Sequence, residues 1–168
     1  MPTVPFFIGT YTVRGSRGIY SSELDLDTGQ ISSPTLAAET ANPTYLALAP
    51  NRQRLYAVSD SASLVAGFSL SPDRRSLTPL AEPQPAVGKP PSHLAIDASA
   101  RVALVAHYHS GYIAAVPLAD TGVPGVPTER VQHTGSSINP DRQTAPHPHC
   151  VVLSPDNRHV LVCDLGVD

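Results

Sequence analysis

The segment PTYLALAPNRQRLYAV occupies residues 43–58 and holds two short apolar stretches separated by a turn. Pro43 opens the first stretch, and Pro50 and Asn51 close it before the second stretch begins at Leu55. Short apolar runs that are rich in Leu, Val and Tyr and bounded by turn-forming residues are typical of β-strands. The segment therefore predicts a β-hairpin.

The same arrangement recurs twice further along the chain. PSHLAID at 91–97 is followed by VALVA at 102–106, and PHCVVLSPDN at 148–157 is followed by VLVC at 160–163. The opening prolines are 48 and 57 residues apart, close to the repeat of about 40–50 residues in β-propellers, whose blades are four-stranded sheets. A further apolar stretch follows each of the first two hairpins, at 64–70 and 112–118. The repeats therefore predict propeller blades.

The N-terminal segment supplies a partial copy of this unit, with expected strands at 6–11 and 18–25. We therefore predict an all-β fold, a β-propeller of about three blades plus the start of a fourth, with residues 1–168 as one partial domain. Propellers commonly close into rings of about four to eight blades. The chain reaches Asp168 where the third strand of the fourth blade is due, so we expect a truncated propeller.

Composition narrows the classes of partner and location. The 18 prolines and 11 glycines disfavour helices. A net charge of −3, with Arg74-Arg75 as an isolated basic pair, lacks the basic patch of a nucleic-acid-binding protein. The first residues have no signal-peptide pattern, and no apolar run is long enough to span a membrane. We therefore expect no nucleic-acid or membrane partner and a cytoplasmic location.

The candidate site lies where the first strand of each blade begins, because in propellers the innermost strands start at a mouth of the central channel. His93 and His149 stand at two of these corners. The long polar loop 133–149 lengthens the second repeat, and loops of this length are often functional. Its composition suits a polar, anionic small molecule. The predicted substrate-binding residues are Arg142, Gln143, His147, His93 and Ser137.

His149 is the predicted catalytic residue, because imidazole titrates near neutral pH and can take a proton from water. The alternative is a hydrogen-bonded turn residue without chemistry. His147 and His149 would point to opposite faces of a strand and so would not share an ion. We therefore predict no metal site and no cofactor. The sequence His107-Tyr108-His109 is interpreted as a solvated turn.

Several motifs resemble a known family of lactonase-type propellers, which includes 6-phosphogluconolactonases and 3-carboxymuconate cyclase. They are Phe7-Ile8-Gly9-Thr10-Tyr11-Thr12, Asn42-Pro43-Thr44-Tyr45-Leu46, Pro91-Ser92-His93-Leu94, Gly135-Ser136-Ser137, Arg142-Gln143, Pro146-His147-Pro148-His149 and Asp164-Leu165-Gly166-Val167-Asp168. The resemblance implies a seven-bladed propeller of roughly twice this length, with the substrate at one end of the channel. His149 matches a histidine proposed as catalytic in the family. An arginine and a glutamate from the next blade would complete that site, and this chain stops before both.

The family usually has Asn at the position of His107. Taken together, the resemblance implies a lactone hydrolase of the 6-phosphogluconolactonase type in the pentose phosphate pathway, with the 168-residue chain itself inactive if the missing residues are essential. Two alternatives stay open, a carboxymuconate-type cyclase that closes a lactone ring and a propeller that only binds a ligand or protein. Self-association through the open propeller edges is also expected.

Overall fold

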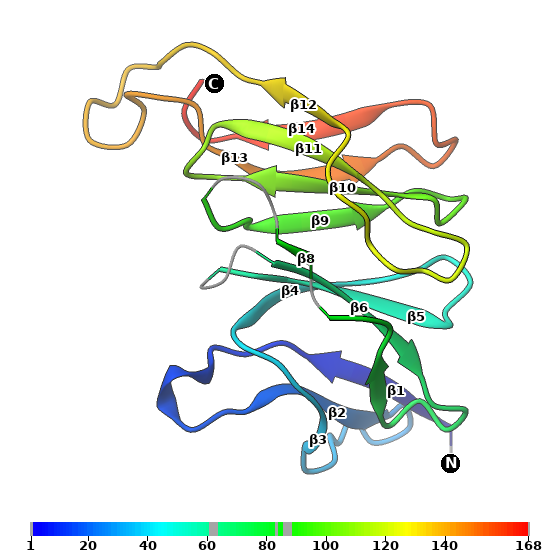
Figure 1. Cartoon of the computed structure of the whole chain (residues 1–168). Coiled ribbons are helices and arrows are strands. Elements are labelled where there is room, and N and C mark those ends of the chain that lie inside the picture. The colour runs from blue at the N-terminus through cyan, green and yellow to red at the C-terminus, as the bar shows by residue number, and fades with distance from the viewer. Residues whose placement is uncertain (1, 61–63, 83, 86–88, 168) are drawn as a thin grey trace.

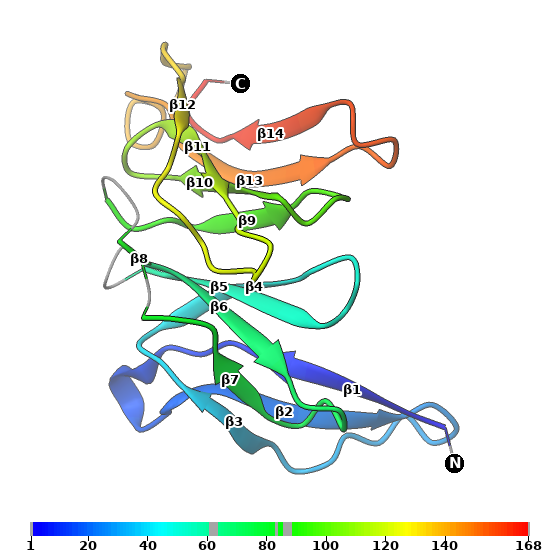
Figure 2. The same cartoon turned by 45° about the vertical axis from the view of Figure 1, so that its right-hand side comes forward.

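The computed structural model describes residues 2–60, 64–82, 84–85 and 89–167, and it is almost entirely β-structure. Its strands form four antiparallel sheets that are stacked in chain order (Figures 1 and 2). The strands are β1 (Thr3–Ile8), β2 (Gly18–Asp25) and β3 (Thr35–Glu39) in the first sheet; β4 (Pro43–Leu48), β5 (Arg54–Ser59), β6 (Leu64–Leu70) and β7 (Leu77–Pro79) in the second, where β8 (Gln84–Pro85) also pairs with β6; β9 (His93–Ile96), β10 (Val102–His107), β11 (Tyr112–Pro117) and β12 (Glu129–Gln132) in the third; and β13 (Pro148–Leu153) and β14 (Val160–Asp164) in the fourth.

Each sheet is a meander in which successive strands pair antiparallel. The first strands β4, β9 and β13 pack on one another, whereas β3 and β7, the last strands of the first two sheets, meet at the outer side. This is the radial arrangement of propeller blades. Because β3 packs beside β7, the fourth strand of the second sheet, β3 is the outermost strand of its own blade. The first sheet therefore lacks an innermost strand. The predicted all-β partial propeller is confirmed.

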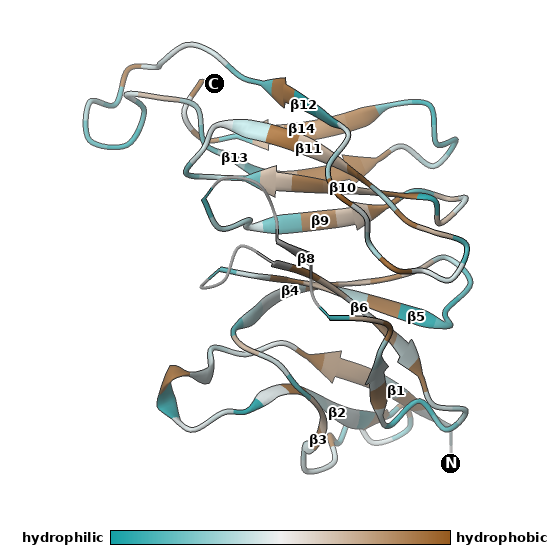
Figure 3. Cartoon of the chain, in the orientation of Figure 1, coloured by the Kyte–Doolittle hydropathy of each residue, from teal (hydrophilic) through white to brown (hydrophobic). Residues whose placement is uncertain are grey.

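The core lies between the sheet faces. Alternate residues of β5 face opposite neighbours: Leu55 and Ala57 pack toward the first sheet, while Tyr56 and Val58 pack toward the third. Because both faces of this strand are covered, its sequence is a continuous apolar run rather than an alternating one. Val151 of β13 closes a smaller cluster against the third sheet. Figure 3 shows the apolar strands joined by hydrophilic loops.

The outer strands carry little sequence signal. All four residues of β12 are exposed, and β7 has only three residues. Strands at the rim of a blade bury few side chains, so they show neither an apolar run nor a clear alternation. The hairpins and third strands were therefore predictable from the sequence, and the fourth strands were not.

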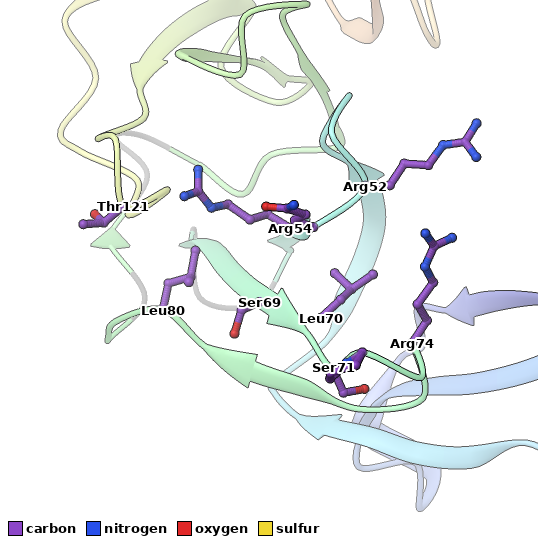
Figure 4. A pocket seen from close by; sticks show the side chains of 10 residues that line it. Arg52, Arg54, Ser69, Leu70, Ser71, Arg74, Leu80 and Thr121 are labelled. Atoms are coloured by element: carbon purple, nitrogen blue, oxygen red, sulfur yellow. The ribbon is translucent and has the colours of Figure 1, made fainter.

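Two arginines occupy turns with a strained backbone. These turns lie at the end of the sheets opposite to the one where β4, β9 and β13 begin. Arg52 and Arg74 have φ angles of 56° and 58°, a left-handed conformation that the fourth sheet gives to Asn157 at φ 58°. Both line a hollow of about 470 Å³ together with Arg54. Figure 4 shows their guanidinium groups on the same side of the hollow, whereas Arg54 points to the other side. Left-handed backbone favours Gly and Asn over long side chains.

Replacing Arg52 or Arg74 with asparagine is expected to stabilise the fold, because each change relieves left-handed strain and removes one of two neighbouring positive charges. The free energy of unfolding should rise by about 0.5–1 kcal/mol per substitution. Urea unfolding with an unchanged m-value measures this. Arg101→Asn, just after the matching turn of the third sheet, is the control and should not stabilise. A lower midpoint for both turn variants would contradict the interpretation.

Candidate functional site

Strand register brings the polar corners of the second, third and fourth sheets to one end of the stack. Pro43 lies opposite Ser59, His93 opposite Ala106, and Pro148 opposite Asp164. The starts of β4, β9 and β13 therefore share an end with the ends of β5, β10 and β14, on the left in Figure 1. A pocket of about 720 Å³ opens there. It is lined by Tyr11, Thr44, Tyr45, Asp60, Pro90, Pro91, Ser92, Tyr108, His109, Arg142, His149 and Leu165.

His149 and Arg142 stand on the wall of this pocket. The exposed imidazole of His149 meets the ring of Tyr108 edge-on, with 5.6 Å between ring centroids and an interplanar angle of 90°. The carbonyl of His149 accepts a hydrogen bond from the hydroxyl of Ser92 at 3.4 Å. Arg142 comes from the polar loop, and its guanidinium is exposed. An imidazole and a guanidinium group therefore share one cavity.

Tyr108 organises the histidines around it. His147 stacks on its ring at 4.5 Å, and His109 meets it edge-on at 4.9 Å. The Nδ1 of His147 donates to the carbonyl of Tyr108 at 3.1 Å, since a carbonyl can only accept. The imidazole of His147 is thereby held against Tyr108 and does not belong to the pocket lining.

Asp164 ties the polar loop to the end of β14. One carboxylate oxygen accepts from the backbone N–H groups of His147 at 2.6 Å and Gly166 at 2.9 Å. The other contacts Nδ1 of His133 at 2.6 Å, and the side chain is only 6% exposed. Burial by itself would raise the pKa of Asp164, but these hydrogen bonds outweigh it and lower that pKa. An ionised, buried carboxylate therefore fixes both ends of the loop.

Gln143 holds the middle of the same loop. Its amide nitrogen donates to the carbonyl of Leu165 at 2.8 Å, and its amide oxygen accepts from the backbone of Asn139 at 3.0 Å. The backbone carbonyl of Gln143 accepts a hydrogen bond from the N–H of Ser137 at 2.9 Å. Gln143 and Ser137 thus shape the loop that carries Arg142, and neither belongs to the pocket lining.

His93 lies behind the pocket between two strands. Its ring lies 3.8 Å from that of Tyr45, its Nε2 is 3.5 Å from the sulfur of Cys150, and its Nδ1 accepts the N–H of Val151 at 3.4 Å. Burial, and secondarily the proximity of His149, lower the pKa of His93. A neutral His93 therefore supports Tyr45, which lines the pocket.

The comparisons with known proteins agree with this geometry. Residues 5–168 match the family described as "Lactonase, 7-bladed beta-propeller". The chain belongs to this lactonase family. The 6-phosphogluconolactonase of Bacillus subtilis is 37% identical to the lactonase-family chain over 164 residues, which are 96% of this chain and 46% of that protein.

Solved structures give the same result. A candidate 6-phosphogluconolactonase from Bacteroides fragilis has a TM-score of 0.90 and 30% identity, over 99% of this chain and 46% of that one. The periplasmic gluconolactonase of Pseudomonas aeruginosa has a TM-score of 0.90 and 26% identity, over 99% and 48%. The lactonase-family chain spans about half the length of the relatives it matches. The family resemblance is confirmed.

The structure divides the six predicted site residues of this lactonase-family chain into two groups. Arg142 and His149 line the pocket. His93, Ser137, Gln143 and His147 lie in the layer that supports it. Their roles stay predictions. In the part of the chain that the structure describes, no group of three or more His, Cys, Asp or Glu side chains could hold a metal ion. No helix there is long and apolar enough to cross a membrane.

Sequence reasoning missed Tyr11, Asp60 and Tyr108, which also line the pocket. Each follows the end of a strand that terminates at the site, namely β1, β5 or β10. A search that included the ends of second strands, and not only the starts of first strands, would have found them. The interpretation of 107–109 as a solvated turn is wrong for His107, which is 1% exposed. This histidine is the last residue of β10, where its ring packs against the neighbouring strand.

Buried His107 should make stability depend on pH. Its ring stacks on Tyr112 at 4.4 Å, and its Nδ1 donates to the carbonyl of Lys89 at 2.9 Å. Burial lowers the pKa of His107, with Arg130 adding to the effect and the bond to Lys89 opposing it. The folded state therefore binds fewer protons than the unfolded state below about pH 6.5. The stability contributed by neutral His107 is complete above that pH and is lost as the pH falls through it.

We expect the free energy of unfolding to fall by about 1 kcal/mol more in the natural chain than in His107→Asn between about pH 7.5 and about pH 5.5. Asparagine keeps a donor for the carbonyl of Lys89 but does not titrate. Urea unfolding at several pH values gives both curves. Parallel curves would show that His107 is not the titrating group.

Proposed function

We propose that the protein hydrolyses the ring of an anionic sugar lactone, as a hydrolase of the 6-phosphogluconolactonase type acting in the pentose phosphate pathway. The observation that carries the proposal is the pairing of His149 with Arg142 on the wall of one pocket of about 720 Å³. The name of the Bacillus subtilis relative supports the same substrate class.

In the proposed mechanism His149 takes a proton from a water molecule as the water oxygen bonds to the lactone carbonyl carbon. The ring C–O bond then breaks, and the proton passes to the departing ring oxygen, which leaves a hydroxy acid. The edge-on contact with Tyr108 orients the imidazole of His149. Arg142 binds the anionic group of the substrate, because its guanidinium offers several fixed donors to phosphate or carboxylate oxygens.

Acid release in a pH-stat measures the reaction directly. We expect faster release from 6-phosphogluconolactone than from gluconolactone, with the Bacillus subtilis 6-phosphogluconolactonase as positive control. Ring closure of a carboxymuconate with no lactone hydrolysis would favour the cyclase. Ligand binding without either reaction would favour the non-catalytic propeller.

Self-association, a cytoplasmic location and the lack of nucleic-acid and membrane partners stay predictions from the sequence. Exposed apolar side chains on the outer sheets, Val4 on β1 and Val152 and Leu161 on the fourth sheet, support self-association. Light scattering should give the mass of a dimer, and a monomer at all concentrations would exclude pairing. Cell fractionation tests the location, since the Pseudomonas aeruginosa relative is named as periplasmic.

A further inference from the structure

The candidate pocket carries opposite charges at its two ends. Asp60 follows β5 of the second sheet and is the single carboxylate among the described residues that line the pocket. Arg142, beside the fourth sheet, is the single lining residue there with a permanent positive charge. The third sheet separates the two, because its first strand packs between β4 and β13. The pocket is therefore acidic toward the N-terminal sheets and basic toward the loop.

Tyr11 lies beside Asp60 at the acidic end. The negative charge of Asp60 is the main cause that raises the pKa of Tyr11, and burial adds to it. The phenol therefore stays protonated and keeps its role as a donor. A carboxylate has about four acceptor positions, so Asp60 can accept several hydrogen bonds at once.

The remaining lining residues suit a molecule with many hydroxyl groups. Tyr45 and Tyr108 present aromatic rings to the pocket, and His93 and His147 pack against those rings at 3.8 and 4.5 Å. Rings fixed in this way offer flat apolar surfaces to a sugar ring, while the hydroxyl groups of Thr44 and Ser92 offer polar contacts. None of these groups is a charged acceptor for the hydroxyl groups of the substrate. Asp60 supplies that acceptor.

We propose that Asp60 is a specificity residue, which binds the hydroxyl groups of a polyhydroxy lactone and leaves the substrate's single anionic group to Arg142. This inference rests on the proposed function and adds the orientation of the substrate. It also predicts what the pocket rejects. A substrate with carboxylates along its whole length, such as a carboxymuconate, would place negative charge beside Asp60 and be repelled.

The kinetic test compares Asp60→Asn with the natural protein on 6-phosphogluconolactone. Asparagine keeps the shape and one acceptor but loses the charge, so kcat/KM should fall by about tenfold, mainly through KM. The matched control is Asp120→Asn, which changes an exposed carboxylate at the opposite end of the strands and should stay within about twofold. An unchanged kcat/KM in Asp60→Asn overturns the proposal.

A binding test separates this inference from the proposed function. The 6-phosphate of glucono-δ-lactam keeps the anionic group proposed for Arg142, and as an amide it cannot be hydrolysed as the lactone is. Calorimetry should show binding about tenfold weaker to Asp60→Asn than to the natural protein. Equal affinities, or no binding to the natural protein, overturn the role of Asp60. Binding that depends on Asp60 without hydrolysis of any lactone supports that role and overturns the hydrolase proposal alone.

Discussion

His149→Gln should lower kcat/KM for the lactone by about 10²–10⁴-fold, the range lost when a general base is removed. Glutamine has a similar length and can still meet Tyr108, but it cannot accept a proton near neutral pH. The loss should appear mainly in kcat, because the change leaves Arg142 and the pocket wall in place.

The control for this prediction is His159→Gln, which changes an exposed histidine in the β13–β14 turn, away from the pocket. Its kcat/KM should match that of the natural protein. A His149→Gln variant with natural kcat would remove the base role from His149 and leave it as a strand residue that lines the pocket.

Of the glycine-to-alanine substitutions near the site, Gly166→Ala should most strongly reduce stability or substrate binding. A Cβ at this position would lie 1.9 Å from the carbonyl oxygen of Ala145 and 2.9 Å from the Cα of Pro146. Both are backbone atoms, so no side-chain rotation can relieve the overlap. Either the loop that carries Arg142 moves, which weakens substrate binding, or the fold loses about 3 kcal/mol or more of stability.

Thermal unfolding and KM for the lactone together detect both outcomes. Gly125→Ala is the matched control, because its nearest neighbour would be the side chain of Pro117 at 3.1 Å, which can shift slightly. It should change stability by about 1 kcal/mol or less. A Gly166→Ala variant with natural stability and natural KM would show that the close approach between the loop and the segment after β14 is not essential.

Strands that are buried on both faces were predictable, because their sequence is a continuous apolar run. The stretch Leu55–Val58 shows this most clearly, since its residues face two different sheets. The exposed strand β12 has no such constraint, and its sequence does not differ from that of a loop. Predictability therefore follows burial, which is high in β5 and β11 and absent in β12.

The site was predictable only in part, for a similar reason. Histidine and arginine stand out in the loop sequence, so His149 and Arg142 were found. Tyr11 and Asp60 meet only because the first and second sheets stack, and no local pattern marks a contact between such distant positions. The supporting role of His147 and Gln143 depends on the carboxylate of Asp164 and the backbone carbonyl of Leu165 at the end of β14, and residue types alone do not reveal these contacts.

The most direct test of the central claim is a crystal structure of the protein with 6-phosphogluconate, the product of the proposed reaction. The account predicts the product in the pocket at the strand ends, with its phosphate on Arg142, its new carboxylate near His149 and its hydroxyl groups toward Asp60. A product bound elsewhere, or a pocket left empty at saturating concentration, would contradict it.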